Sequence, residues 1–578
     1  MSLFALNQPG LRRAVGVVLP LLAYYALTVL LLGGLVDWSS YYFGYSTDSV
    51  LFVWFLHWWP FAITHGLNPF LCHYVWFPSG YNFAWATSIP FLALLAWPIT
   101  ALAGPLISYN FLAMAGPAMA GWAAYLLCFG LTRNRVAAFI GGFLFAFSMP
   151  ELYQAGELNL CTVFLIPLAV LLCLRRVKGQ MGRWRFVLLL GLLLAAQMGI
   201  STEMLAASCL MGMLGWAVFL AFAPASARGA FWRLAIDVAL AAPLAICLTA
   251  PFLYYLITGL PEVPPNIHGA MLFEFEALNF LVPAVPVHSA AEALHMIAAQ
   301  WRGFRPNYYT YISAPGLLIV LLYAWRHIRQ AYSQALLALL VLIAILSLGP
   351  GLRFNNHLTH VPLPWAMVMH IPILNGIIPP RLLLYFSLGA SVITALWLAE
   401  AKKPAARAQR LALALLACLF TRPGKIQIFP ATWETQPVFQ EQAELKWTRW
   451  PVQPFFTPRH VRQALGPMPN VLLMPDPVTG PGLAWQLQAD MGFTQATGYI
   501  GFRLRPEWKW ARMDQLIWGQ IMPDFDTFFP AFCAAHQVGY ILIGPGVPPQ
   551  VVGAIQGLGW PHRMDRGIEV VKAPFGPR

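Results

Sequence analysis

Charged residues are scarce in this chain. Only 10% of its 578 residues are Asp, Glu, Lys or Arg, whereas 59% are hydrophobic. Because a typical soluble domain is about 25% charged, this composition excludes an ordinary soluble protein. The composition predicts a polytopic membrane protein, and the length leaves room for a second, soluble domain.

Motifs for nucleic acid and for zinc are also missing. The formal net charge is +13, but no basic run interleaves with aromatic residues in a soluble region, which argues against nucleic-acid binding. The eight cysteines form no Cys-x-x-Cys pair and no Cys/His spacing typical of zinc. The sequence therefore calls for no metal or other cofactor, although a divalent cation stays open. Only Cys72 and Cys533 fall in outer segments, where a disulfide is chemically allowed, and nothing pairs them.

The charges that are present are distributed unevenly. We let the apolar runs before residue 422 alternate across a membrane, starting with Arg12 and Arg13 inside. Of the 21 Lys and Arg residues in this stretch, 17 then fall on one face, and nine of the 11 Asp and Glu residues fall on the other. The basic face is cytoplasmic by the positive-inside rule. The outer face holds nearly all the carboxylates and a few isolated arginines, so we expect any chemistry there.

Eleven apolar segments are interpreted as transmembrane helices, since about 20 apolar residues span a bilayer. They are residues 14–35, 109–131, 136–150, 159–174, 185–201, 204–223, 234–257, 309–325, 334–349, 379–399 and 406–421. An odd number of spans places the C-terminus outside. The prediction is a transmembrane domain over residues 1–421.

Two extramembrane regions complete the predicted organisation. The first outer loop, residues 36–108, contains the apolar stretches Val50–Ile63 and Ser88–Leu102, which are short or interrupted by proline and rich in aromatic residues. Such residues favour the membrane interface, and we interpret both stretches as interfacial helices in the outer leaflet. In residues 422–578, short strand-like runs alternate with helical ones, which predicts an extracytoplasmic α/β domain.

Three outer carboxylates are candidates for a site. Asp48 lies near the outer end of the first span, and it is either a catalytic group or a helix N-cap before residues 49–63. Glu157 and Glu203 lie at corners between predicted spans. A carboxylate at such a corner is either solvated or lines a cavity between helices. In a cavity, the free-energy cost of burying its charge points to a functional role.

Outer cations supply the matching candidates for an anion site. Arg381 stands at the outer start of a predicted span, where a guanidinium and a helix N-terminus together can bind an anion. Arg302 and Arg305 are a second pair of candidates. The alternative for these arginines is that they snorkel to lipid headgroups. His57 is a further substrate-binding candidate, although a lone histidine among aromatic residues is more often structural.

Short motifs stand in and between the predicted spans, and they are Phe77-Pro78-Ser79-Gly80, Ile89-Pro90-Phe91, Gly104-Pro105, Arg133-Asn134-Arg135, Ser148-Met149-Pro150-Glu151 and Gly156-Glu157-Leu158-Asn159. Together with the layout of the whole membrane part, these motifs resemble the polyprenyl-phosphate-sugar-dependent glycosyltransferases of the GT-C fold. This resemblance implies a GT-C membrane fold, a lipid-linked donor, and Asp48 as the family's outer-loop aspartate. Some members carry a second acid in this loop, whereas here none follows Asp48 before Glu151.

The chemistry of sugar transfer gives an independent reason for these residue types. A base must take the proton of the acceptor hydroxyl, which suits Asp48. A departing lipid phosphate needs cations, which suits Arg381 with Arg302 or Arg305. The sequence therefore predicts an inverting glycosyltransferase of the cytoplasmic membrane that moves a sugar from a polyprenyl phosphate to a glycan, lipid or protein acceptor outside. The alternatives are a non-catalytic scaffold or accessory subunit, and a transporter of lipid-linked sugar.

Overall fold

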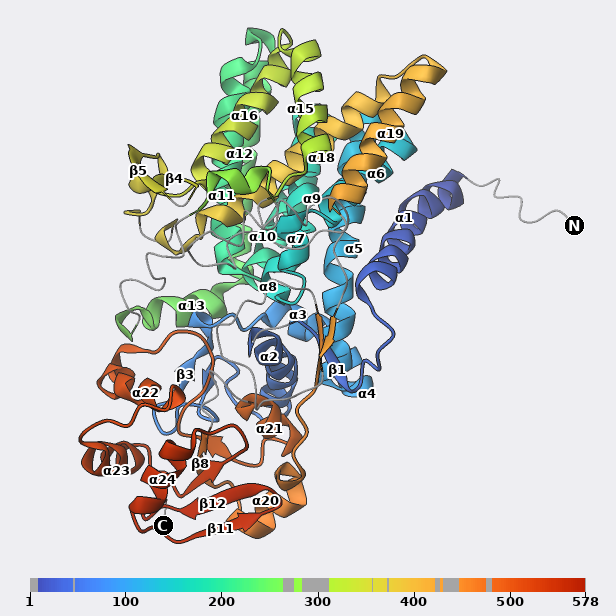
Figure 1. Cartoon of the computed structure of the whole chain (residues 1–578). Helices are drawn as coiled ribbons and strands as arrows, with labels where there is room; N and C mark the ends of the chain where they lie inside the picture. Colours follow the sequence, from blue (N-terminus) through green and yellow to red (C-terminus); the bar gives the residue numbers. More distant parts are fainter. Residues whose placement is uncertain are drawn as a thin grey trace, which may run out of the picture.

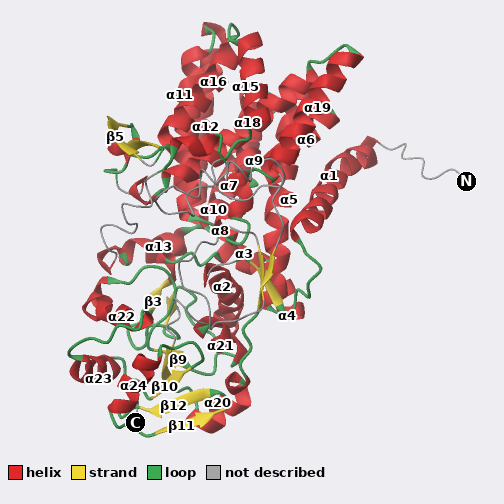
Figure 2. Cartoon of the chain, viewed as in Figure 1, coloured by secondary structure: helices red, strands yellow, loops and turns green. Residues whose placement is uncertain are grey.

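Helices gather at one end of the molecule, and most strands lie at the other end with the C-terminus (Figure 1; Figure 2). The computed structural model describes residues 9–44, 47–262, 275–282, 311–355, 357–371, 374–421, 427–429, 446–474 and 481–576. The turn between α15 and α16 and the turn between α18 and α19 lie at the far end of the helices from the C-terminal strands (Figure 1).

A helix overlaps each segment that was predicted to span the membrane. These helices are α1 (Pro9–Leu32), α5 (Pro105–Thr132), α6 (Arg135–Ala146), α8 (Leu158–Cys161), α9 (Leu165–Val177), α10 (Arg183–Met198), α11 (Thr202–Phe222), α12 (Ala225–Leu248), α15 (Ala314–His327), α16 (Ala331–Ser347), α18 (Leu383–Ala399) and α19 (Pro404–Thr421). Within the described ranges, six helical segments are long and apolar enough to cross a membrane: Val15–Leu32, Pro105–Thr132, Leu158–Val177, Thr202–Phe222, Ala225–Leu248 and Pro379–Ala399. The protein is therefore a multi-pass membrane protein, and the total of eleven spans stays a prediction.

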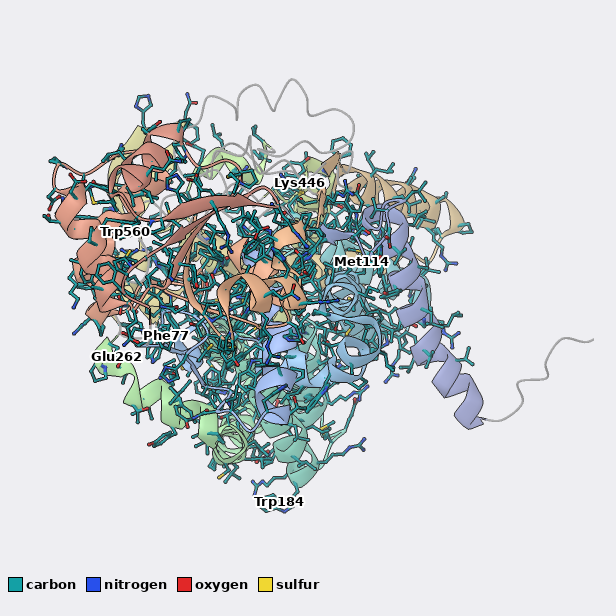
Figure 3. The ribbon with its side chains drawn as sticks, turned by 90° about the horizontal axis from the view of Figure 1, so that it is seen from below. Phe77, Met114, Trp184, Glu262, Lys446 and Trp560 are labelled. Atoms are coloured by element: carbon teal, nitrogen blue, oxygen red, sulfur yellow. The ribbon has the colours of Figure 1, made fainter. Side chains whose placement is uncertain are left out.

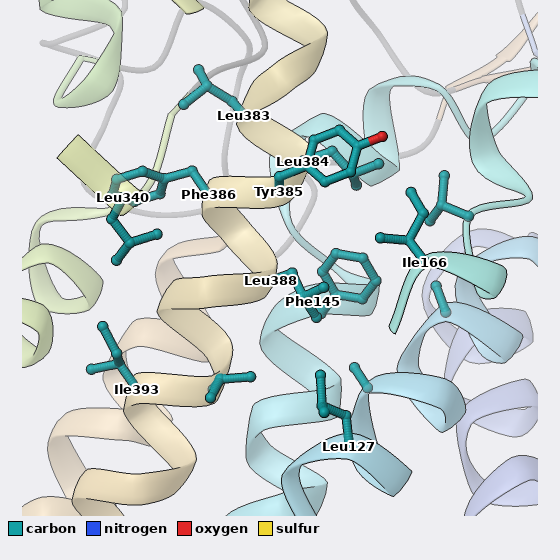
Figure 4. Packing of buried hydrophobic residues seen from close by; sticks show 14 of the residues in the cluster. Leu127, Phe145, Ile166, Leu340, Leu383, Leu384, Tyr385, Phe386, Leu388 and Ile393 are labelled. Atoms are coloured by element: carbon teal, nitrogen blue, oxygen red, sulfur yellow. The ribbon is translucent and has the colours of Figure 1, made fainter. Parts of the chain in front are cut away.

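Helix α5 is central to the helical end and packs against α1, α6, α9 and α18. A Cβ on Gly142 of α6 would come within 2.5 Å of the carbonyl oxygen of Gly121 in α5, so glycine is required for this approach. Small residues commonly allow membrane helices to pack this closely. On α18, Leu388 lies beside Phe145 of α6 (Figure 4). Helix α18, which begins near the charged residues described below, is thus packed against the core.

Helix α1 packs against α5 along one face and is exposed along much of its remaining surface. Seen from the end at which the C-terminal residues lie, it projects sideways from the rest of the molecule (Figure 3). Leu19, Leu22 and Leu30 are 61%, 60% and 79% exposed. Apolar side chains so exposed on a span-length helix are typical of a lipid-facing surface.

The first outer loop folds into short elements around one buried helix. They are β1 (Tyr41–Phe43), α2 (Thr47–Thr64), β2 (Leu71–Cys72), β3 (Tyr81–Asn82), η1 (Phe83–Trp85), α3 (Pro90–Leu95) and α4 (Trp97–Ala103). Trp54 and Trp58 of α2 are 0% and 1% exposed, and the Trp54 indole N–H donates to Gln486 Oε1 at 2.9 Å. Protein therefore covers aromatic side chains of α2, and the placement of residues 50–63 in the outer leaflet stays a prediction. In α3 and α4, Leu95 and Leu102 are 61% and 89% exposed.

Other outer segments contain short elements. They are α7 (Met149–Tyr153), α13 (Ala250–Thr258), η2 (Leu260–Glu262), η4 (Ala277–Phe280), β4 (Gly351–Phe354), β5 (His357–Pro362), α17 (Trp365–Val368), η6 (Leu374–Gly376) and η7 (Pro379–Leu382). Strands β4 and β5 form an antiparallel hairpin, and η7 leads directly into α18. The outer side of the helices therefore carries folded connections near the start of α18.

The C-terminal residues fold around a five-stranded mixed sheet. Its order is β11-β12-β10-β8-β9, with β8 parallel to both β10 and β9 and with β12 antiparallel to both β10 and β11. The strands are β8 (Asn470–Met474), β9 (Thr494–Gln495), β10 (Tyr540–Ile543), β11 (His562–Asp565) and β12 (Ile568–Lys572). The remaining elements are η8 (Pro454–Phe456), α20 (Pro458–Leu465), α21 (Gly482–Gln488), η9 (Arg505–Met513), α22 (Asp514–Ile517), α23 (Phe525–Ala535) and α24 (Pro549–Gly557). The predicted strand-like runs coincide with β8, β10 and β12.

The C-terminal unit, residues 446–576, is joined closely to the first outer loop. Strand β7 (Lys446–Arg449) pairs with β1 and with β6 (Gln427–Phe429) in a three-stranded sheet. Residues 494–497 run beside residues 74–77, where Phe77 N–H donates to Gln495 O and Trp76 N–H donates to Thr497 O. These bonds fix the C-terminal unit against the loop that carries Asp48. That it forms a separate domain from residue 422 stays a prediction.

Candidate functional site

Asp48 lies in the first turn of α2, and its carboxylate contacts the C-terminal unit. The hydroxyl of Tyr499 donates to Asp48 Oδ1 at 2.6 Å. The first turn of a helix also favours a negative charge through the helix dipole. Because Asp48 is the second residue of α2, it lies inside the helix and is not its N-cap. Its catalytic role stays a prediction, and its carboxylate makes a long-range contact of the kind found in a built site.

Close packing of two backbone segments holds Asp48 near Glu157. A Cβ on Gly156 would lie 3.1 Å from Gly44 Cα, and a Cβ on Gly44 would lie 2.2 Å from Ser49 Oγ. The hydroxyl of Tyr109 lies 2.6 Å from the carbonyl oxygens of both Phe43 and Gly156, which ties the same two segments together. The glycines are needed because any side chain would separate the start of α2 from the start of α8.

Glu203 and Arg381 form an ion pair beside these two carboxyl groups. Glu203 lies in the first turn of α11, which Ser201 caps by accepting a bond from Met204 N–H. Arg381 lies in η7, and its guanidinium donates to Glu203 Oε2. Both side chains are 20% exposed. The pair is therefore anchored in protein and still open to solvent.

Electrostatic interactions show that these four groups share one site. Burial raises the pKa of Asp48 above its usual value, and the bond from Tyr499 and the charge of Arg381 oppose the rise. Burial also raises the pKa of Glu157, to about 8, with Asp48 and Glu203 adding to the rise and Arg381 opposing it. We call Asp48, Glu157, Glu203 and Arg381 the outer cluster. Adjacent carboxyl groups with raised pKa values are a common property of acid–base sites.

His57, another predicted site residue, lies outside this cluster. His57 follows Asp48 by nine residues in α2, which is about 13 Å along a helix. Its ring stacks on Phe61, and burial lowers its pKa, so a structural role fits its surroundings. Arg302 and Arg305 lie outside the described residues. Among the residues that the structure describes, no group of three or more His, Cys, Asp or Glu side chains is placed to hold a metal ion.

Tyr499 is a site residue that the sequence did not indicate. It lies between Gly498 and Gly501, and a Cβ on Gly498 would come within 2.8 Å of Val75 Cβ. The tyrosine reaches Asp48 because this glycine lets the C-terminal segment lie against the first outer loop. The only sequence signal is an aromatic residue in a Gly-Tyr-Ile-Gly run, which is too common to indicate a contact. Cys72 and Cys533 are both free thiols.

Comparisons with known proteins agree with a membrane fold of this type. Residues 19–420 match a family model described as "Domain of unknown function (DUF6311)". The mycobacterial arabinofuranosyltransferase AftD is similar in structure, with a TM-score of 0.52 and 13% identity, over 96% of this chain and 41% of AftD. This likeness shows a GT-C-type fold.

Lower-scoring similarities extend to an archaeal enzyme. The Archaeoglobus fulgidus oligosaccharyltransferase AglB, in complex with an inhibitory peptide and a dolichol-phosphate, has a TM-score of 0.48 and 15% identity, over 92% of this chain and 70% of AglB. The apo form of the A. fulgidus oligosaccharyltransferase has a TM-score of 0.46 and 14% identity, over 91% and 69%. No curated protein sequence matches this chain.

Proposed function

Because the chain belongs to the DUF6311 family, whose description names no activity, we propose its function from the outer cluster: it is an inverting membrane glycosyltransferase. Its donor is a sugar on a polyprenyl phosphate, and its acceptor is a hydroxyl of a glycan, lipid or protein at the outer face of the cytoplasmic membrane. The observation that carries this proposal is the convergence of three carboxyl groups and one guanidinium from four distant segments.

The outer cluster supplies the groups that this reaction needs. As the acceptor oxygen attacks the anomeric carbon, its proton passes to Asp48 and the bond from that carbon to the phosphate oxygen breaks. Arg381 stabilises the negative charge that the departing polyprenyl phosphate gains, and Glu203 orients its guanidinium. Glu157, with its raised pKa, stays protonated at neutral pH and adds no further negative charge beside the phosphate.

Two parts of the proposal extend beyond the described cluster. Arg302 and Arg305 are proposed as further phosphate ligands because they are among the few outer cations of the sequence. The C-terminal unit is proposed to be extracytoplasmic and to cover the site, and its Tyr499 bond to Asp48 supports this role. Burying several carboxyl groups together costs free energy, and a scaffold would gain nothing that offsets this cost. The outer cluster therefore favours an enzyme.

The decisive experiment supplies radiolabelled polyprenyl phosphate sugars, one at a time, to the purified protein in lipid nanodiscs with membrane extract as acceptor. We expect label to move from one donor to an acceptor, and Asp48→Asn to abolish the transfer. Asp37→Asn is the matched control, because Asp37 is an exposed carboxylate that bonds only to nearby Ser39 and Ser40 in the described structure. Unchanged transfer by Asp48→Asn would remove Asp48 as the base.

The phosphate site has its own test. Arg381→Ala should raise the KM for the donor about 10- to 100-fold, the value of a charge-assisted hydrogen bond, and leave the KM for the acceptor unchanged. Arg449→Ala, at an exposed arginine of β7, is the control. A change confined to the acceptor KM would place Arg381 outside the phosphate site.

A further inference from the structure

A cavity of about 50 Å³ lies directly beside the outer cluster. Glu203, which pairs with Arg381, lines it, together with Asn159 of α8 and Thr202 of α11. Its opposite wall is the segment from Ala86 to Pro90 of the first outer loop. Whatever occupies this cavity therefore lies next to the proposed phosphate ligand.

A buried amide oxygen in this cavity has no partner within the described structure. Asn159 is 6% exposed, and its Oδ1 accepts no hydrogen bond there. Gln197, which precedes the lining residue Met198, is 3% exposed, and neither its oxygen nor its nitrogen is bonded within the same residues. Buried polar atoms are nearly always satisfied in proteins, so an acceptor left open toward a cavity points to a ligand.

The wall opposite these amides is held in an unusual conformation. Ile89 has φ 44° and ψ 46°, in the left-handed region. A β-branched residue rarely adopts this conformation, and a following proline disfavours helical backbone further. Bonds on both sides hold it: Trp59 donates to Ser88 O, and Phe91 N–H donates to Gly199 O. Such strain persists where the surrounding structure imposes it, which is typical of binding sites.

The polar groups that line the cavity define the class of ligand. The side chains of Asn159, Thr202 and Ser88 are neutral, and the charged side chain is the carboxylate of Glu203. These oxygens accept hydrogen bonds from hydroxyl groups and repel a second carboxylate. The volume has room for a few water-sized groups, so it fits the hydroxyls of one ring better than a second sugar.

We infer that this cavity is the pocket for the transferred sugar, and that it selects a single neutral sugar with free hydroxyls over uronate donors. The inference rests on the proposed glycosyltransferase function. The sugar lies beside Glu203, its phosphate lies at Arg381, and its anomeric carbon faces Asp48. Asn159 accepts a hydrogen bond from a sugar hydroxyl and sets donor specificity.

The test compares donors with and without the sugar. In nanodiscs, Asn159→Leu and Thr202→Val, which keep the number and branching of side-chain heavy atoms, should each raise the KM for the sugar donor about tenfold, the worth of one hydrogen bond. Inhibition by sugar-free polyprenyl phosphate should stay unchanged in both variants, because that ligand does not enter the cavity. Asn375→Leu, at an exposed position of η6, is the matched control. Size-exclusion profiles and thermal unfolding check that each variant is folded.

The outcomes separate the inference from the proposed function. If the wild-type protein transfers no sugar from any donor, both fall. If it transfers sugar but the donor KM changes less than twofold in both cavity variants, only the inference falls. If polyprenyl phosphate uronates serve as well as neutral donors, the assigned class of sugar is wrong. Equal weakening of sugar-free polyprenyl phosphate would place the lipid phosphate, rather than the sugar, in the cavity.

Discussion

Two clusters of charged side chains in the helical part of this protein are built differently. In the inner cluster, Asp237 of α12 is fully buried and accepts bonds from Arg176 Nε at 2.6 Å and Arg183 Nε at 2.8 Å. In the outer cluster, Asp48, Glu157 and Glu203 all interact with the guanidinium of Arg381. Helix α10 starts at the inner cluster and ends at the cavity beside the outer one, about 24 Å away at 1.5 Å per residue.

The difference lies in the balance of charge. The inner aspartate is fully buried and has two cations, as expected for a group that ties helices α9, α10 and α12 together. The outer cluster has three carboxyl groups and one cation, and its Glu203–Arg381 pair is 20% exposed. A carboxylate that is fully paired with cations stabilises a fold, whereas carboxyl groups that outnumber their cations have raised pKa values and can exchange protons with a substrate.

The same substitution in the two clusters should have opposite effects. Asp48→Asn should lower kcat about a thousandfold, the usual value of a general base, with thermal stability kept because the amide oxygen still accepts from Tyr499. Asp237→Asn should leave kcat unchanged and lower the free energy of unfolding by about 3 kcal/mol, since two arginines lose their counter-charge. Sugar transfer and thermal unfolding in nanodiscs measure both. Equal losses of activity would mean that the two clusters do not have separate roles.

The sequence predicted the members of the outer cluster better than their arrangement. Asp48, Glu157, Glu203 and Arg381 were found because few charges fall on the outer face and each stands at a helix start or corner. Their convergence depends on the approach of Gly44 to Gly156, and no periodicity reports such a contact. Helix placement followed from apolar length, since a helix overlaps every predicted span.

Contacts over long sequence distances explain what the sequence missed. The aromatic residues of α2 indicated a membrane interface, but an aromatic helix covered by the C-terminal unit has the same composition. Tyr499 is 451 residues from Asp48. It reaches the site through backbone pairing between residues 74–77 and 494–497, which involves no distinctive side chains.

Glu157 should give the outer cluster a pH dependence that the inner one lacks. Its pKa is raised to about 8, so it is neutral below that pH and gains a charge beside the donor phosphate above it. The donor KM of the wild-type protein should therefore rise severalfold between pH 7 and pH 9, and Glu157→Gln should flatten this rise. Asp237→Asn should keep the wild-type profile.

The stability of the folded chain should also depend on the protonation of Glu157. The folded chain keeps the proton of Glu157 up to about pH 8, whereas the unfolded chain releases it near pH 4.3, the ordinary value for Glu. The folded state then binds more protons in this window, so its stability falls as pH rises from about 4 to 8. Glu157→Gln should remove that part of the fall in thermal unfolding scans. A wild-type slope in the variant would contradict the raised pKa.

The smallest effect is expected at Tyr499, which acts on Asp48 rather than on the substrate. Its hydroxyl bond lowers the pKa of Asp48 against the effect of burial, so Tyr499→Phe should raise that pKa and move the acid limb of kcat toward higher pH. One hydrogen bond to a carboxylate corresponds to about 1.5 kcal/mol, or about tenfold in activity on the acid limb. Tyr332→Phe, at a half-exposed tyrosine of α16, is the control. A uniform loss at every pH would indicate a structural role for Tyr499, because only a change in the ionisation of Asp48 makes the effect larger in acid and small above neutrality.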